Sequence, residues 1–243
     1  MELLEREIAA QRPGEQKQPS AVMWQPLGPA PIPISPTTSY SGRVSAIAVH
    51  PTNANIVYVG TAQGGVYRSL NGGTTWTPIM DGAQTLAIGA VAISPSDPTT
   101  IFVGTGEAAL CGSGCYIGIG IYRITNAETT PVLSGPLNQG SAGGDVFTGR
   151  AISKIIVHPT NPNILFATST SGVAGIGGTT VGLALPLAGL YRTTNALGAV
   201  PTFERLSVSP SGNVSRSTVD AVIEPDNPNR LIVTVIGSGG DGG

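Results

Sequence analysis

A strand–turn–strand pattern that occurs four times constrains the fold more than any other feature of this sequence. The four copies align without a gap on Pro51, Pro95, Pro159 and Pro225, and they read AIAVHPTNANIVYVGT, AVAISPSDPTTIFVGT, KIIVHPTNPNILFATS and DAVIEPDNPNRLIVTV. In each copy, two runs rich in small and β-branched residues flank a turn that contains Pro with Asn or Asp. Four aligned copies predict a repeat architecture built from β-strands.

The second half of the repeat predicts two more strands. Third strands are indicated by GVYRSLN from Gly65, GIYRITN from Gly120 and GLYRTTN from Gly189. A fourth strand follows as TWTPI in the first unit and within ALGAVPTFERL in the third unit, where Phe203 takes the place of Trp76. Four antiparallel strands per unit are typical of a β-propeller blade. The 44 positions that separate Pro51 from Pro95 fit one blade.

We therefore predict an all-β fold, a β-propeller of four-stranded antiparallel blades. The blades are expected at about 41–80, 86–130, 148–208 and 215–243. The fourth unit offers only its first two strands before the sequence reaches DGG, so we expect about three and a half blades of an incomplete propeller.

The residues that precede the predicted blades differ from them in composition and pattern. In residues 1–12, Leu4 and Ile8 are four positions apart and Pro13-Gly14 follows, which predicts a short helix. Residues 13–40 contain seven prolines and predict an extended linker or strap rather than a packed core.

Composition limits the partners of this chain. Charged residues make up 11% of it, and its only lysines are Lys17 and Lys154, so we expect no basic field for nucleic acid. We find no apolar run of about 18 residues and expect no membrane insertion. The first residues also lack the features of a signal peptide. A surface so poor in charge favours either secretion or cover by other subunits, and we expect an extracellular or cell-surface location.

The two cysteines, Cys111 and Cys115 in CGSGC, form either a local disulfide or two free thiols. With only His50 and His158 as further ligands of that kind, they do not make a zinc site. We expect neither a metal nor another cofactor.

The segment SLNGGTTW matches the Asp-box pattern Ser/Thr-x-Asp/Asn-x-Gly-x-Thr-Trp through Ser69, Asn71, Gly73, Thr75 and Trp76. It resembles the BNR/Asp-box repeat. The Asn side chain is expected to bond the amides of its own turn, Gly to permit positive φ, and Trp to pack between neighbouring sheets. The same offset carries Asn126 and Asn195 in degenerate copies, which favours a structural role.

A wider resemblance covers roughly residues 24–243. The segments WQPLGPAPIP, SGRVSAIAVHPTNANIVYVGTAQGGVYRS and LAIGAVAISPSDPTTIFVGTGE are similar to sortilin-like and sialidase-like bacterial propellers that carry Asp boxes. Secreted sialidases, xyloglucanases, photosystem-assembly propellers and receptor ectodomains all use such blades. The resemblance therefore implies the fold and leaves the activity open.

Three arginines are candidates for ligand binding. Arg43, Arg150 and Arg216 each lie near the start of a predicted first strand, so they could converge at one mouth of the central channel. One interpretation is an anion site of the kind a sialidase uses, and the other is that they bond loop carbonyls. The sialidase mechanism also needs a Tyr–Glu pair, and we recognise no such pair in the sequence.

Two carboxylates are candidates for catalysis. Glu107 and Asp220 are the acidic residues closest to the ends of inner strands, and two carboxylates that face a cleft can hydrolyse a glycoside. The chain offers 12 aromatic residues in all, which is few for a platform that stacks sugars.

We expect a non-catalytic binding or scaffolding module in an extracellular or cell-surface assembly. Its partners would be other protein subunits, bound through residues 1–40 and the open sheet edge, and a glycan is a further candidate ligand. The alternative is part of a secreted glycoside hydrolase or sialidase-like enzyme whose active site lies partly in missing blades. A third hypothesis is an assembly factor for a membrane complex that uses an arginine-lined face.

Overall fold

The computed structural model describes residues 32–40, 42–107, 116–170, 184–208, 216–224 and 226–236. The chain divides into two compact units, residues 1–41 and 42–243. The predicted helix at 1–12, residues 13–31 of the predicted strap, and both cysteines lie outside the described residues.

The described part of the first unit is a β-hairpin. Strand β1 (Ile32–Ser35) pairs antiparallel with β2 (Thr38–Tyr40), with an irregular register between Pro33 and Ser35. The backbone N–H of Thr37 donates to Oγ of Ser35 at 3.3 Å and tightens the turn. A two-stranded hairpin tolerates proline because its edges need not donate hydrogen bonds, so this end of the predicted strap is a hairpin.

The second unit consists of antiparallel sheets that follow one another along the chain. In the first and second sheets the strands are β3 (Val44–Val49), β4 (Val57–Thr61), β5 (Val66–Ser69) and β6 (Thr77–Pro78), then β7 (Ile88–Ser94), β8 (Asp97–Thr105), β9 (Ile121–Thr125) and β10 (Val132–Leu137). In the third and fourth sheets they are β12 (Ala151–Val157), β13 (Leu165–Thr170), β14 (Gly189–Thr193) and β15 (Thr202–Leu206), then β16 (Thr218–Glu224) and β17 (Asn227–Val235).

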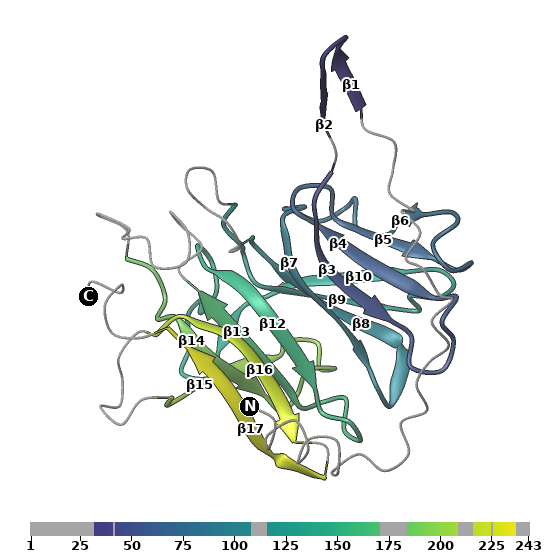
Figure 1. The fold of residues 1–243 in the computed structure, drawn as a ribbon. Helices are drawn as coiled ribbons and strands as arrows, with labels where there is room; N and C mark the ends of the chain where they lie inside the picture. The colour runs from purple at the N-terminus through teal and green to yellow at the C-terminus, as the bar shows by residue number, and fades with distance from the viewer. Residues whose placement is uncertain are drawn as a thin grey trace, which may run out of the picture. The chain divides into compact units, whose positions relative to one another are not determined.

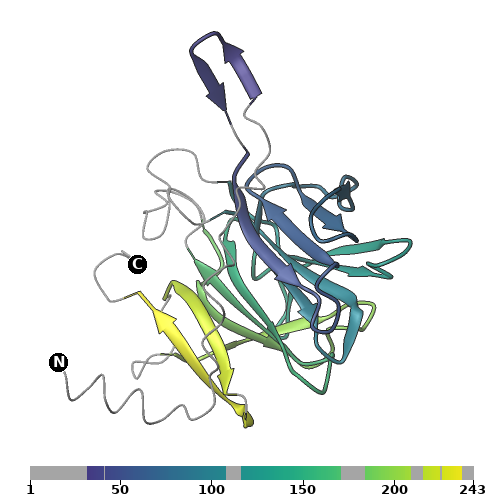
Figure 2. The same cartoon turned by 45° about the vertical axis from the view of Figure 1, so that its right-hand side comes forward.

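These sheets are the blades of a β-propeller. Apart from β11, strand order within each sheet follows the chain, and the first strands β3, β7, β12 and β16 contact one another in that order (Figures 1 and 2). The predicted all-β propeller of four-stranded antiparallel blades is confirmed. The described residues hold three complete blades and a two-stranded part of a fourth.

Two strands lie outside the predicted scheme. Strand β10 runs to Leu137, past the expected end of the second blade at about 130. Strand β11 (Gln139–Gly140) then joins the third blade, where it pairs in parallel with Thr202 and Phe203 of β15. The third blade is therefore a five-stranded sheet.

The hydrophobic core lies between the blades. One cluster packs the first blade against the second and includes Tyr58, Ile88, Ile101 and Val103. Another packs the second blade against the third and includes Phe102, Ile152, Ile155, Leu165 and Phe147. Because alternate strand residues point to opposite faces, the second blade contributes one face to each cluster, with Ile101 and Val103 in the first and Phe102 in the other.

Glycine sets how closely two blades approach. A Cβ atom placed on Gly104 of β8 would lie 2.5 Å from Cγ2 and 2.7 Å from Cβ of Ile152 in β12. Only a residue without a side chain leaves room for Ile152 at this position. The described part of the chain contains no helix long and apolar enough to cross a membrane.

Candidate functional site

The turn from Ser69 to Trp76 is organised by short-range side-chain bonds. Oγ of Ser69 accepts the N–H groups of Asn71 and Gly73 at 3.3 and 2.8 Å, and it donates to Oδ1 of Asn71 at 3.0 Å. Oδ1 of Asn71 also accepts the N–H of Thr75 at 2.9 Å, and Gly73 has a φ of 91°. These polar groups satisfy the backbone of their own turn.

The degenerate copies keep parts of this pattern. In the third blade, Thr193 Oγ1 donates to Oδ1 of Asn195 at 2.8 Å, and the N–H of Thr202 donates to that oxygen at 3.0 Å. In the second blade, Asn126 adopts a φ of 52°, and its carbonyl accepts the N–H of Thr129 at 3.0 Å. Asn is among the residues that tolerate positive φ best.

Trp76 departs from the expectation that it packs between neighbouring sheets. It is 41% exposed, and its ring lies 3.5 Å from where a Cβ of Gly73 would be. Phe203, at the equivalent position of the third blade, is 2% exposed and packs edge-to-face on Phe147. The difference follows from β11 and the loop after it, which cover β15 in the third blade.

Arginine side chains link successive blades. Nη1 of Arg68 in β5 donates to the carbonyls of Ala127 and Thr129 at 2.8 and 3.1 Å, in the turn between β9 and β10. Nη1 of Arg123 in β9 donates to the carbonyls of Ala196 and Gly198 at 2.8 and 3.0 Å, in the turn between β14 and β15. We call this contact the arginine clasp. Sequence reasoning missed it, although the repeated Tyr-Arg pair was its signal.

Arg192 is the third copy of the clasp residue and has a different partner. Its Nη2 donates to Oε2 of Glu204 at 2.8 Å within the third blade. On the neighbouring fourth strand, Arg68 faces Thr77 in the first blade and Arg123 faces Ser134 in the second. Among the three arginines, only Arg192 faces a carboxylate. Both side chains are well exposed to solvent.

The catalytic candidate Glu107 and the ligand-binding candidate Arg43 form an ion pair. Nη2 of Arg43, directly before β3, lies 2.5 Å from Oε2 of Glu107, two residues after the end of β8. Glu107 is 2% exposed, and its N–H donates to the carbonyl of Tyr116 at 2.9 Å. A buried carboxylate requires such a compensating partner, and the pair joins the first and second blades.

The other two predicted arginines have separate partners. Arg150 lies directly before β12, and its Nε donates to the carbonyl of Pro186 at 2.7 Å. Arg216 lies just before β16, and its backbone N–H donates to the carbonyl of Ala188 at 3.1 Å. All three arginines lie one or two residues before the first strand of a blade, near its start as the sequence predicts. Arg43 and Arg150 bond a carboxylate and a loop carbonyl respectively.

Asp220 lies on β16, next to the inner strand of the third blade. Its Oδ1 is 3.3 Å from Nζ of Lys154 in β12, and both side chains are exposed. Lys154 also lines a hollow of about 510 Å³ whose other walls are mostly aliphatic side chains of β3, β7, β12 and β16. The structure therefore places Asp220 with Lys154, and Glu107 with Arg43.

A histidine adds a second link between the first two blades. Nδ1 of His50 accepts the N–H groups of Thr52 and Asn53 at 3.2 and 3.0 Å, so the proton of the neutral ring is on Nε2. Nε2 lies 3.1 Å from Oε1 of Glu128, in the turn of the second blade. His158 makes the same Nδ1 contacts with Thr160 and Asn161 in the third blade.

Two buried tyrosines hold their protons firmly. Burial, followed by the charge of Glu128, raises the pKa of Tyr58 to about 12, against a smaller opposing effect of Arg68. Burial also raises the pKa of Tyr191, whose hydroxyl donates to the carbonyl of Leu187. A tyrosine nucleophile needs the opposite shift of its pKa.

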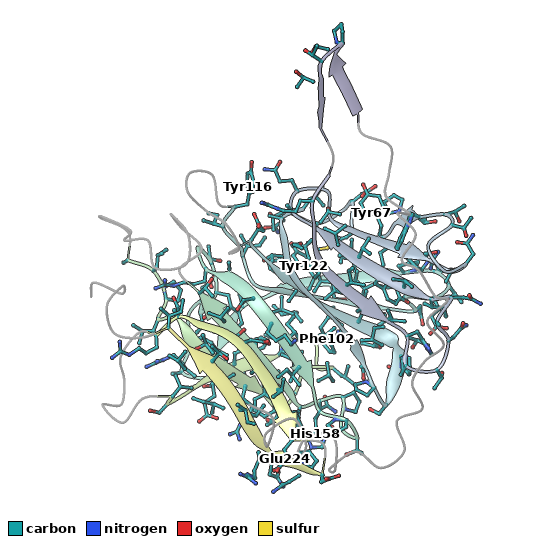
Figure 3. All side chains as sticks on the ribbon, viewed as in Figure 1. Tyr67, Phe102, Tyr116, Tyr122, His158 and Glu224 are labelled. Atoms are coloured by element: carbon teal, nitrogen blue, oxygen red, sulfur yellow. The ribbon has the colours of Figure 1, made fainter. Side chains whose placement is uncertain are left out.

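Within the described ranges, no group of three His, Cys, Asp or Glu side chains could hold a metal ion. Figure 3 shows His158 and Glu224 near the same end of their blades and Tyr116 near the other end.

No protein family model and no curated protein matches this chain. Among solved structures, it is similar to an ancestral GH74 enzyme, with a TM-score of 0.54, 22% identity and coverage of 88% of this chain and 23% of that chain. A GH74 enzyme from Niastella koreensis has a TM-score of 0.53 and 22% identity, with 79% and 25% covered. The GH74 xyloglucanase from Xanthomonas campestris has a TM-score of 0.54 and 15% identity, with 82% and 27% covered. The chain thus spans about a quarter of the length of these neighbours, and at such identities the similarity shows a shared β-propeller fold.

Proposed function

We propose that this chain is a non-catalytic binding and scaffolding module, an Asp-box propeller segment that associates with other protein subunits. We place it in an extracellular or cell-surface assembly, because its surface carries few charges and its turns resemble those of the sortilin-like and sialidase-like propellers.

The observation that carries the proposal is the exposure of aliphatic side chains on the first and fourth blades. Ile47 of β3 is 66% exposed, whereas Ile155 at the same repeat position in the third blade is 4% exposed. Ile232 of β17 is 70% exposed, whereas Tyr58 and Phe102 at its repeat position are fully buried. These strand faces carry apolar side chains at the positions that are buried between blades elsewhere, so they are suited to being covered by protein.

The pairing of the candidate carboxylates supports a non-catalytic role. Glu107 is buried against Arg43 and helps to hold two blades together. Asp220 is paired with Lys154 on the neighbouring blade. A glycosidase needs two carboxyl groups that flank one bond, whereas Glu107 and Asp220 are each paired with a different cationic side chain.

Association can be tested with surface variants. The chain would be isolated from its source and analysed by light scattering and by mass spectrometry of whatever co-purifies. Ile232→Ser should weaken the association, whereas Val200→Ser, which changes an equally exposed side chain in a loop, should leave it unchanged. A monodisperse monomer that co-purifies with nothing would refute the scaffold role.

The second candidate is part of a secreted glycoside hydrolase. It is favoured by the three GH74 enzymes among the structural neighbours, one of which is described as a xyloglucanase. Release of reducing sugar from a glycan panel that includes xyloglucan, lost in Glu107→Gln with an unchanged unfolding temperature, would support this candidate. That result would overturn the non-catalytic role.

A further inference from the structure

The third blade carries a pocket of about 250 Å³ between β15, the loop after β11 and the segment that leads into β14. Tyr191 pairs with Arg205 across β14 and β15, and Phe203 lies two residues from Arg205, so all three side chains share one face of the sheet. They line the pocket from the side of the sheet. We call this pocket the β15 pocket.

The walls of the β15 pocket are mainly apolar. Tyr191 and Phe203 are each 2% exposed, and the buried ring of Phe147 packs edge-to-face on both, with ring centroids 4.9 Å apart. Val146 and Leu187 add aliphatic side chains, and Leu187 is 39% exposed, so the pocket opens to solvent. An apolar cavity of about 150 Å³ holds a benzene ring, so the β15 pocket has room for one ring with a small substituent.

Arg205 gives the pocket a positive charge. A Cβ atom placed on Gly189 would lie 3.5 Å from both Cδ and Nη1 of Arg205, so this side chain extends across β14 toward Gly189. Burial raises the pKa of Tyr191, and the charges of Arg205 and Arg150 oppose that rise, so both guanidinium groups lie near the phenol. A guanidinium has five N–H donors and can bind a carboxylate in addition to its contacts within the protein.

The carboxylate that also lines the pocket, that of Asp145, is held by its own loop. Its Oδ1 accepts the N–H groups of Phe147 and Thr148 at 2.9 and 2.8 Å. Its Oδ2 accepts Nδ2 of Asn138 at 2.8 Å and the hydroxyl of Thr148 at 2.5 Å. Because four hydrogen bonds within the loop hold Asp145, the charge that a ligand meets in the pocket is that of Arg205.

The blade repeat itself does not require these features. In the first blade, Pro78 pairs with Tyr67, the equivalent of Tyr191, so that position carries no charge. The first blade also has Trp76 where the third has the smaller Phe203. Among the described strands, the first and second sheets have no counterpart of β11, which precedes the loop of the pocket. The cation, the smaller ring and the covering loop thus occur together on one blade.

We propose that the β15 pocket binds a small organic acid with one apolar ring, whose carboxylate pairs with Arg205 and whose ring contacts Tyr191 and Phe203. A carboxylate matches the planar donors of a guanidinium, and removal of the ring from water adds to the affinity. The ligand is small and makes one charged contact, so we expect millimolar affinity. This site goes beyond the scaffolding function, and either proposal can fail without the other.

The test uses the intact chain with benzoate as the probe and benzamide, an uncharged molecule of the same shape, as the control ligand. Affinities are measured by ligand-observed NMR titration. Benzoate should bind at least tenfold more tightly than benzamide. Arg205→Met, which keeps an aliphatic stem, should weaken benzoate binding at least tenfold and leave benzamide binding unchanged. Arg192→Met, which removes the same charge from the opposite face of the blade, should bind benzoate like the native chain.

Phe203→Trp tests the cavity itself, because it places in the pocket the ring that the first blade carries at this position. It should abolish binding of both ligands, and its circular dichroism spectrum checks that the fold is kept. The comparison of the two ligands on the native chain needs no variant, so the proposal stays testable if Phe203→Trp does not fold.

Four results would overturn the proposal: no benzoate binding at millimolar concentration, equal affinities for benzoate and benzamide, unchanged benzoate binding by Arg205→Met, or binding that persists in folded Phe203→Trp. Subunits that co-purify with a chain that does not bind benzoate would leave the scaffolding function standing and refute the β15 pocket alone.

Discussion

Replacing Arg123 with Met should destabilise the junction between the second and third blades. Met keeps an aliphatic stem and removes the guanidinium, so the variant isolates the polar contact. Two hydrogen bonds are lost, to the carbonyls of Ala196 at 2.8 Å and Gly198 at 3.0 Å, and Ala196 is buried. A hydrogen bond to a charged group contributes about 1.5–3 kcal/mol, and both bonds share one partly exposed nitrogen, so we expect a loss of about 2–3 kcal/mol.

The matched control is Arg192→Met, at the same repeat position. Arg192 pairs with the exposed Glu204, and an exposed pair of this kind contributes about 0–1 kcal/mol. Urea unfolding, extrapolated to water with the slope compared between variants, gives both free energies. Equal losses in the two variants, or a loss below about 0.5 kcal/mol for Arg123→Met, would refute the assignment of the clasp as a blade-to-blade link.

Three further perturbations test the packing and the charges. Gly104→Ala should lower the free energy of unfolding by about 1–3 kcal/mol, because the added Cβ meets Ile152. Gly82→Ala, which has open space around the added Cβ, should leave it unchanged. Equal melting temperatures of the two variants would contradict this prediction. Tyr58→Phe should leave stability at neutral pH unchanged or raise it by about 1 kcal/mol, since the buried hydroxyl has no hydrogen-bond partner among the described residues. Because the folded pKa of Tyr58 is raised to about 12, its contribution is lost as pH rises above 10, and Tyr58→Phe should flatten that alkaline loss in urea unfolding. The hydrogen bond from Thr100 lowers the pKa of Asp97 below 3.8, so the stabilisation that this carboxylate provides in the folded state is lost as the pH falls. Asp97→Asn should therefore lose less stability than the native chain between about pH 5 and pH 3. Parallel curves of stability against pH for the two proteins would argue against this prediction.

The blades could be predicted because the relevant information is local. The turn prolines and the β-branched runs around them recur in every unit, and pairing within a blade joins strands that are close in sequence. Strand β10 was missed because its sequence VLSGPL contains Gly and Pro, which usually mark turns. Strand β11 pairs in parallel with residues more than 60 positions away, and no local pattern announces such a partner.

The candidate site was harder to predict because its partners are distant in sequence. Arg43 and Glu107 are 64 positions apart, and the sequence suggested a separate role for each of them. The pairing arises because the end of the second strand in one blade meets the start of the first strand in the preceding blade. The environment of Trp76 depends in the same way on whether another segment covers its blade, as β11 covers Phe203.

The clasp residues show how one repeat position serves different purposes. Arg68 and Arg123 face small polar residues on their own blade and turn toward the next one. Arg192 faces Glu204, which orients its guanidinium and limits the cost of exposing it. Glu204 therefore keeps the third arginine on its own blade, whereas the first two arginines bond the turn of the following blade.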